Sequence, residues 1–113
     1  MKLRLAGLFT IGLMAGALSS QAQSYNITDL GVLPGDNNST VGGLNGPGQA
    51  AGTSSSSSGA IATLFSNGQA ISLGALGASD MSFAEAINGS GQVVGYDWLS
   101  SGVSHAFLYS NGR

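Results

Sequence analysis

His105 is the only histidine of the chain and the residue with the widest catalytic range, because an imidazole can act as a general base near neutral pH. Serine is abundant and five Asp and Glu residues are present, so every residue type of a Ser-His-Asp triad occurs. The sequence nevertheless contains no Gly-x-Ser-x-Gly nucleophile elbow. His105 also lies inside a segment, residues 104–109, that is typical of a β-strand. We therefore expect a structural or surface histidine and no catalytic residue.

Oxygen-bearing side chains gather at residues 36–39, where one Asp, two Asn and one Ser follow one another. Ca²⁺ prefers such ligands, but the spaced acidic positions and the distal Glu of a calcium-binding loop are missing. Asp and Asn are also common in turns, where their side chains bond to the nearby backbone. The chain has no Cys, which excludes a thiolate nucleophile and a cysteine-ligated zinc site. We predict a turn here, and neither a metal site nor a cofactor.

Tyr96 and Trp98 are candidates for a binding surface, because they flank a single residue next to a loop that differs between the two halves of the chain. Exposed aromatic rings can form a platform for a small ligand or a glycan, while the same rings can equally fill a core. Both interpretations remain open. Together with His105, these two residues make up the ligand surface that the sequence proposes.

The charge distribution narrows the kinds of partner. Two of the three basic residues, Lys2 and Arg4, lie at the extreme N-terminus, which leaves Arg113 to face five Asp and Glu. Binding to nucleic acid requires clustered basic side chains that neutralise phosphates, and binding to a membrane surface requires a polybasic patch. We therefore expect an extracellular ligand, a glycan or a protein as partner, and no nucleic acid.

Residues 1–22 have the organisation of a secretory signal peptide. The two basic residues precede an uncharged apolar run of 14 residues, 5–18, and small side chains follow at Ser20 and Ala22. This run is shorter than the roughly 20 residues that a membrane-spanning helix needs. We predict a mature chain of residues 23–113 that is extracellular or periplasmic, with no stable membrane anchor after cleavage.

The remaining chain is a two-copy repeat, with repeat 1 at about 27–69 and repeat 2 at about 70–113. A shift of 43 residues, which becomes 44 after one extra residue in the second copy, aligns identical short motifs in the same order. These are Leu-Gly at 30–31 and 73–74, Asn-Gly at 45–46 and 88–89, Gly-Gln at 48–49 and 91–92, and Ser-Asn-Gly at 66–68 and 110–112. Each copy is predicted to contain about four strands that follow one another as an antiparallel meander.

Turn signals separate the expected strands. Asn67-Gly68 favours a type I′ turn, because both residues tolerate a positive φ, and it lies between segments with strand composition. The strands are expected at residues 60–65, 69–73, 82–87, 92–96 and 104–109. Residues 25–30 are expected to form an isolated fourth strand, and the serine run at 54–58 is expected to be a flexible, solvated loop.

Three motifs of the second copy carry a resemblance to a known family. They are Leu-Gly-x-Leu-Gly at 73–77, Ile-Asn-x-x-Gly-Gln-Val-Val-Gly-Tyr at 87–96 and His-Ala-Phe-Leu-Tyr-Ser-Asn-Gly at 105–112. This pattern resembles the extracellular repeats of the HAF family, and the first copy follows it more loosely, with Ile-Ala-Thr at 61–63 in place of His-Ala-Phe. The resemblance implies a secreted or envelope-associated bacterial protein with more than two repeats. It implies no reaction and no catalytic residue.

The predicted fold class is all-β, with two tandem antiparallel meander repeats of about 43–44 residues that resemble β-propeller blades. The second copy lacks its last strand, which favours a longer propeller, while a small sheet or sandwich is the alternative. Two functions remain open. One is a non-enzymatic secreted or envelope repeat module that acts as a scaffold or binding surface and can self-associate through uncovered blade faces. The other is a fragment of a secreted propeller-type hydrolase whose active site lies in missing repeats.

Export is the first testable prediction. Mass spectrometry of the protein expressed in a Gram-negative host should find an N-terminus near Gln23 and should find the protein outside the cytoplasm, because residues 1–22 combine a basic start, an apolar run and small residues before the cut. Soluble cytoplasmic protein that retains Met1, in cells whose export machinery works, would contradict the prediction.

Overall fold

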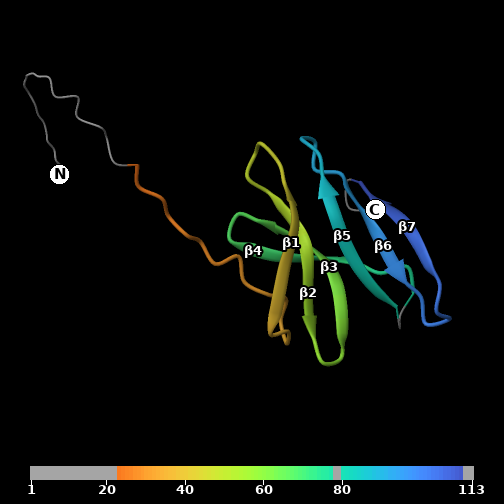
Figure 1. The fold of residues 1–113 in the computed structure, drawn as a ribbon. Coiled ribbons are helices and arrows are strands. Elements are labelled where there is room, and N and C mark those ends of the chain that lie inside the picture. The colour runs from red at the N-terminus through yellow and green to blue at the C-terminus, as the bar shows by residue number, and fades with distance from the viewer. Residues whose placement is uncertain (1–22, 78–79, 111–113) are drawn as a thin grey trace, which may run out of the picture.

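A computed structural model describes residues 23–77 and 80–110, and these residues form two antiparallel β-sheets (Figure 1). Sheet 1 contains β1 (Asn38–Leu44), β2 (Ala50–Ser56), β3 (Gly59–Ser66) and β4 (Gln69–Gly74). Sheet 2 contains β5 (Met81–Ile87), β6 (Val93–Trp98) and β7 (Ser104–Tyr109). Within each sheet, every strand pairs with the strand that precedes or follows it along the chain, so both sheets are meanders. The prediction of an all-β chain is confirmed. The predicted signal peptide lies outside the described residues.

The β3–β4 hairpin closes through the turn that its sequence predicts. Asn67 has φ 54° and Gly68 has φ 76°, which are the two positive values that a type I′ turn requires. The residues on either side, Ser66 and Gln69, pair across the hairpin. The predicted Asn-Gly turn is therefore confirmed.

The two Asn-Gly-x-Gly-Gln motifs form the same hydrogen-bonded turn in both sheets. In sheet 1, the N–H of Asn45 donates to the carbonyl of Gln49 at 3.0 Å, and the N–H of Gln49 donates to Asn45 Oδ1 at 2.8 Å. In sheet 2, Asn88 and Gln92 make the same two bonds at 3.0 and 2.9 Å. The Asn side chain thus replaces a backbone acceptor within the turn, which accounts for the presence of Asn and Gln at this spacing in both copies.

A β-bulge and a glycine occupy matching places in the two sheets. The register shifts between Val41 and Gly43 in β1, and between Ala84 and Ala86 in β5. In the neighbouring strands, a Cβ atom at Gly52 would lie 1.9 Å from the Thr40 carbonyl oxygen, and one at Gly95 would lie 2.0 Å from that of Phe83. No side chain fits at either position, because the neighbouring backbone approaches too closely.

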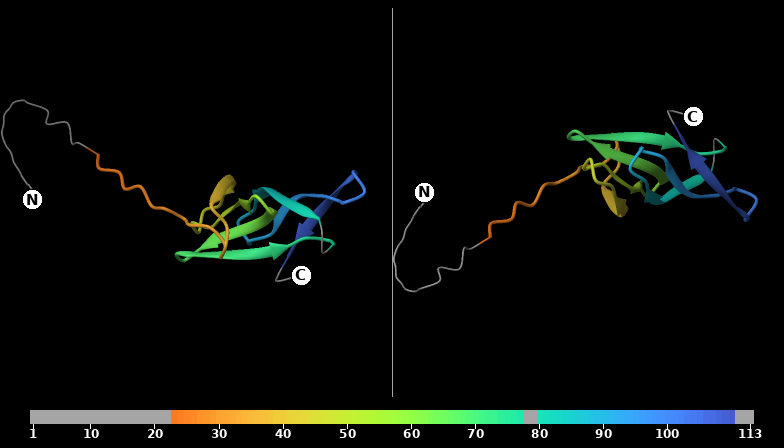
Figure 2. Two further views of the ribbon diagram at one scale, coloured as in Figure 1. Left: turned by 90° about the horizontal axis from the view of Figure 1, so that it is seen from below. Right: turned by 90° about the horizontal axis from the view of Figure 1, so that it is seen from above.

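The sheets pack face to face through small side chains, and Figure 2 shows the resulting layers from two directions. Strand β5 lies against β1, β2 and β3 of sheet 1. The buried centre consists of Ala51, Ala62, Ala84 and Val93, with Leu73, Ile87, Phe107 and Tyr109 around it. Alanine at three of the four central positions allows the two backbones to come close together.

Ser82 joins the two sheets by hydrogen bonds through its buried hydroxyl group. The hydroxyl accepts the backbone N–H of Ala62 in β3 at 2.7 Å and donates to the carbonyl of Gly74 at the end of β4 at 2.7 Å. These two groups lie where the register between β3 and β4 shifts. The serine therefore gives buried backbone groups the partners that they need inside the core.

Two expectations about local structure are wrong. Residues 54–56 of the serine run belong to β2, and Ser54 is fully buried, where its hydroxyl accepts the N–H of Leu33 and donates to Asp36 Oδ2. A small hydroxyl side chain fits under the N-terminal segment and satisfies both groups. Residues 25–30 form no strand in the described structure. They are extended and exposed, with Thr28 and Leu30 beside the β3–β4 hairpin, and the chain before them leads away from sheet 1 (Figure 1).

The glycine constraint leads to a prediction about stability. Gly52→Ala should lower the free energy of unfolding by about 3 kcal/mol, because its Cβ would collide with the backbone of β1. Gly46→Ala is the matched control, since nothing lies within 4 Å of its added Cβ, and it should change stability by less than about 0.5 kcal/mol. Chemical denaturation of both variants measures the difference. Equal stabilities would contradict the close approach of β1 and β2.

Candidate functional site

The most distinctive exposed region is the face of sheet 2 that points away from sheet 1, which we call the outer face. Its side chains form three rungs across the sheet, because residues that pair directly lie on the same side. The rungs are Ala86, Val94 and Leu108, then Phe83, Tyr96 and Ala106, then Met81, Trp98 and Ser104. Eight of these nine residues are apolar or aromatic.

The matching positions of sheet 1 on β2 and β3 are buried or half-buried, whereas Asn38 and Thr40 on β1 are exposed. Ala51 is 0% exposed, whereas Val94, its counterpart 43 residues later, is 46% exposed. Leu64 is 8% exposed, whereas Leu108, its counterpart 44 residues later, is 57% exposed. Sheet 2 covers this face of sheet 1, and nothing among the described residues covers the same face of sheet 2. The outer face thus has the composition of an interior surface but lies in contact with solvent.

Two of the three predicted ligand-surface residues lie together. Tyr96 and Trp98 are on adjacent rungs of the outer face, and the Tyr96 ring stacks on Phe83 with centroids 5.0 Å apart and planes 22° apart. His105 pairs with Asp97, which lies between the two aromatic residues on β6 and points to the opposite side. The structure therefore separates His105 from the aromatic pair.

Sequence reasoning missed Phe83 as a member of the outer face. The signal was available, because Phe83 and Tyr96 belong to strands joined by a predicted turn. Their direct pairing, however, depends on the bulge between Ala84 and Ala86, which shifts the register by one residue. A sequence pattern alone does not locate such a bulge.

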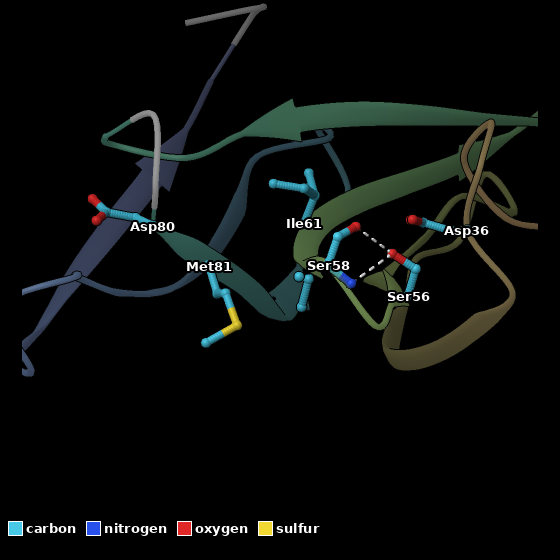
Figure 3. Close-up of a pocket in the computed structure, with 8 residues that line it drawn as sticks. Asp36, Ser56, Ser58, Ile61, Asp80 and Met81 are labelled. Carbon is cyan, nitrogen blue, oxygen red and sulfur yellow. Dashed lines mark hydrogen bonds between the residues drawn. The ribbon is translucent and has the colours of Figure 1, made fainter.

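A shallow cleft between the two sheets, with a volume of about 210 Å³, is the second candidate region. In Figure 3, Asp36 and Asp80 lie at opposite ends of this cleft, with Ser56 and Ser58 between them. Each carboxylate already accepts a hydrogen bond, from Ser54 Oγ at 2.6 Å and from the N–H of Ser100 at 2.9 Å. The two serine hydroxyls bond to one another at 2.8 Å. These hydrogen bonds stabilise the loops at the edge of the cleft. No histidine lines the cleft to activate a serine.

The turn predicted at residues 36–39 lies earlier in the chain, where the N–H of Asp36 donates to the carbonyl of Leu33 at 3.0 Å. Asp36 lies under sheet 1 and bonds to Ser54, while Asn38 and Ser39 begin β1. Across residues 23–77 and 80–110, no three His, Asp or Glu side chains lie close enough together to hold a metal ion. The same ranges contain no helix long and apolar enough to cross a bilayer.

One buried carboxylate has an incomplete set of partners. Asp97 is 1% exposed, and its Oδ2 accepts the N–H of Leu76, while its Oδ1 has no hydrogen-bond partner among the described residues. Its counterpart in sheet 1 is Ser54, which accepts the N–H of Leu33 in the same way. Both side chains therefore fix the segment that precedes the first strand of their sheet, which is a structural role.

The position of His105 leads to a prediction about chemistry. Screens with ester, peptide and glycoside substrates should find no turnover that His105→Ala abolishes, because no serine hydroxyl is hydrogen-bonded to this exposed imidazole in the described structure. Tyr96→Ala serves as the matched control on the opposite face of the sheet. Turnover that is lost in the His105 variant and retained in the Tyr96 variant would refute the prediction.

The site is therefore an apolar and aromatic sheet face, accompanied by a cleft whose polar groups are already bonded to one another. Tyr96 and Trp98 contribute to it, and His105 does not. Comparisons of the chain with protein-family models, with curated proteins and with solved structures find no match.

Proposed function

We propose that this chain is a non-enzymatic repeat module of a secreted or envelope-associated bacterial protein, and that it acts as a scaffold through protein contacts on the outer face. One observation carries the proposal. The apolar residues Ala51, Ala62 and Leu64 are buried in sheet 1, and their counterparts on the exposed face of sheet 2 are also apolar, namely Val94, Ala106 and Leu108. The resemblance of residues 73–112 to the HAF extracellular repeats supports the same function, as does the predicted signal peptide.

A protein partner fits the outer face better than a glycan. A sugar-binding platform combines an exposed ring with polar groups that bond to hydroxyls. Around Trp98 and Tyr96, the outer face offers mainly Ala, Val, Leu, Met and Phe side chains. Such a flat apolar surface is complementary to another apolar sheet face.

The way in which the sheets stack supports the finer proposal of blade-like repeats. The outward side of sheet 1 and the inward side of sheet 2 carry equivalent positions, such as Phe65 and Tyr109. The contact between the sheets is therefore head-to-tail, since each sheet uses one face toward the preceding repeat and the other toward the following one. Repetition of this contact generates the stacking of propeller blades.

Trp98 provides the experiment, because it is the only tryptophan in the chain and it lies on the outer face. Its emission should shift to shorter wavelength as the protein concentration rises, when an apolar protein surface covers the ring. Leu108→Lys should weaken this association by about 10- to 100-fold, which corresponds to the loss of one buried leucine side chain, about 1.5–3 kcal/mol.

Val103→Lys is the matched control. Val103 is similarly exposed but lies in the β6–β7 turn, outside the outer face, and this variant should associate like the unaltered chain. A panel of soluble bacterial polysaccharides should leave the Trp98 emission unchanged. Emission that responds to a polysaccharide and not to protein concentration would replace the scaffold with a glycan-binding module.

A further inference from the structure

The sequence repeat and the sheet have different boundaries. Strand β4 comes after the Asn67-Gly68 turn and so lies in repeat 2, yet it pairs with β3 and completes sheet 1. Each repeat therefore contributes its first strand to the sheet before its own. Sheet 2 has three strands, and within the described ranges no strand pairs with the outer edge of β7. An unpaired strand edge of this kind is ready to accept another strand.

The counterpart of β4 in repeat 1 is the segment 26–31, which lies 43 residues earlier and pairs with no strand of the described chain. Its Ile27 is 100% exposed. This segment contains the β-branched residues Ile27 and Thr28, and it ends in the same Leu-Gly pair as β4. Its sequence matches a β-strand, but it pairs with no strand of the described sheets.

The C-terminal end of this segment already has the geometry of the end of β4. Gly31 and Gly74 both have φ 82°. The N–H of Gly31 donates to Asp29 Oδ1 at 2.9 Å, as that of Gly74 donates to Ser72 Oγ at 3.2 Å. The carbonyl of Gly31 accepts the Ser39 hydroxyl at 2.8 Å, as that of Gly74 accepts the Ser82 hydroxyl at 2.7 Å.

The strand cannot reach β7 of its own chain without a large rearrangement. Gly31 is held to sheet 1 through Ser39, and the segment projects from that side of the molecule. Strand β7 lies at the opposite end in every view (Figures 1 and 2). The acceptor edge that the segment can reach therefore belongs to another molecule.

We propose that residues 26–31 of one copy add to β7 of a second copy as the missing fourth, antiparallel strand of its sheet 2. The pairing of β3 with β4 fixes the register. In sheet 1, Leu64 pairs with Ile71. The counterpart of Leu64 is Leu108 and that of Ile71 is Thr28. We therefore expect Thr28 of one copy to lie opposite Leu108 of the other. This inference rests on the proposed function and names its partner, which is a second copy of the chain.

The same docking adds a further hydrogen bond to groups that already make one in the single chain. Ser82 accepts the N–H of Ala62, and the corresponding pair across the new contact is Ser39 of one copy and Ala106 of the other. Asn45 uses its second amide hydrogen to reach the Asn88 carbonyl of the next sheet at 3.0 Å. Asn88, in turn, can reach the Asn45 carbonyl of the second copy. The outer face of sheet 2 is then covered by a sheet, as the matching face of sheet 1 already is.

Cysteine cross-linking tests the register, and the absence of native Cys makes the result unambiguous. In a chain that carries Thr28→Cys and Leu108→Cys, paired positions place the two Cα atoms within the span of a disulfide. Oxidation of the full chain should give disulfide-linked dimers and longer oligomers on non-reducing gels. A chain with Thr28→Cys and Ser57→Cys, in the exposed β2–β3 turn, is the control and should remain monomeric.

Ser39→Ala provides a second measurement. It should weaken association by about fivefold, through the loss of the hydrogen bond to Ala106 of the other copy. The monomer also loses the exposed bond from Ser39 to the Gly31 carbonyl, and its stability should fall only slightly. Ser57→Ala, in the turn, should change neither quantity. Equal association of the two serine variants, together with equal cross-linking of the two cysteine pairs, would overturn the proposal.

The remaining outcomes separate this inference from the proposed function. A disulfide inside one molecule would show that the strand folds back onto its own β7, and it would overturn the intermolecular pairing. Concentration-dependent covering of Trp98 without the Thr28–Leu108 cross-link would overturn strand donation but would leave the scaffold function in place.

Discussion

The Ser82 hydroxyl is the contact on which the arrangement of the two sheets depends. It accepts the N–H of Ala62 and donates to the carbonyl of Gly74, so one small side chain of sheet 2 reaches two strands of sheet 1. These backbone groups lie beside the buried, alanine-rich centre between the sheets, which leaves little room for water. Without Ser82 they would be buried without hydrogen-bond partners. The small residues permit close packing, and the serine makes that packing compatible with a polar backbone.

Much of the local structure could be predicted from the sequence, because the turns contain residues that favour one turn conformation. Asn67-Gly68 specifies a type I′ hairpin, and the two Asn-Gly-x-Gly-Gln motifs specify a turn closed by the Asn side chain. The serine run was misjudged, since composition predicts solvation while Ser54 is buried under the N-terminal segment. That burial depends on Leu33 and Asp36, and a long-range contact of this kind leaves no local pattern.

The candidate site was predictable only in part for a related reason. Alternation along β6 places Tyr96 and Trp98 on one face and Asp97 on the other, and this follows from their spacing. The exclusion of His105 follows from its register with Asp97, which depends on the length of the β6–β7 turn. The apolar character of the outer face as a whole emerges only when Val94 and Leu108 are compared with their buried counterparts in sheet 1.

The offset between repeat and sheet, described for β4, also has a consequence for how such a gene can grow. Duplication of any 43- or 44-residue stretch of the repeat supplies three strands of a new sheet and the strand that closes the sheet before it. The breakpoint can therefore fall at almost any codon, in a turn or within a strand, and the product still contains complete sheets. Recombination within the coding sequence then changes the length of the array without disturbing the contacts of the repeats that are already present.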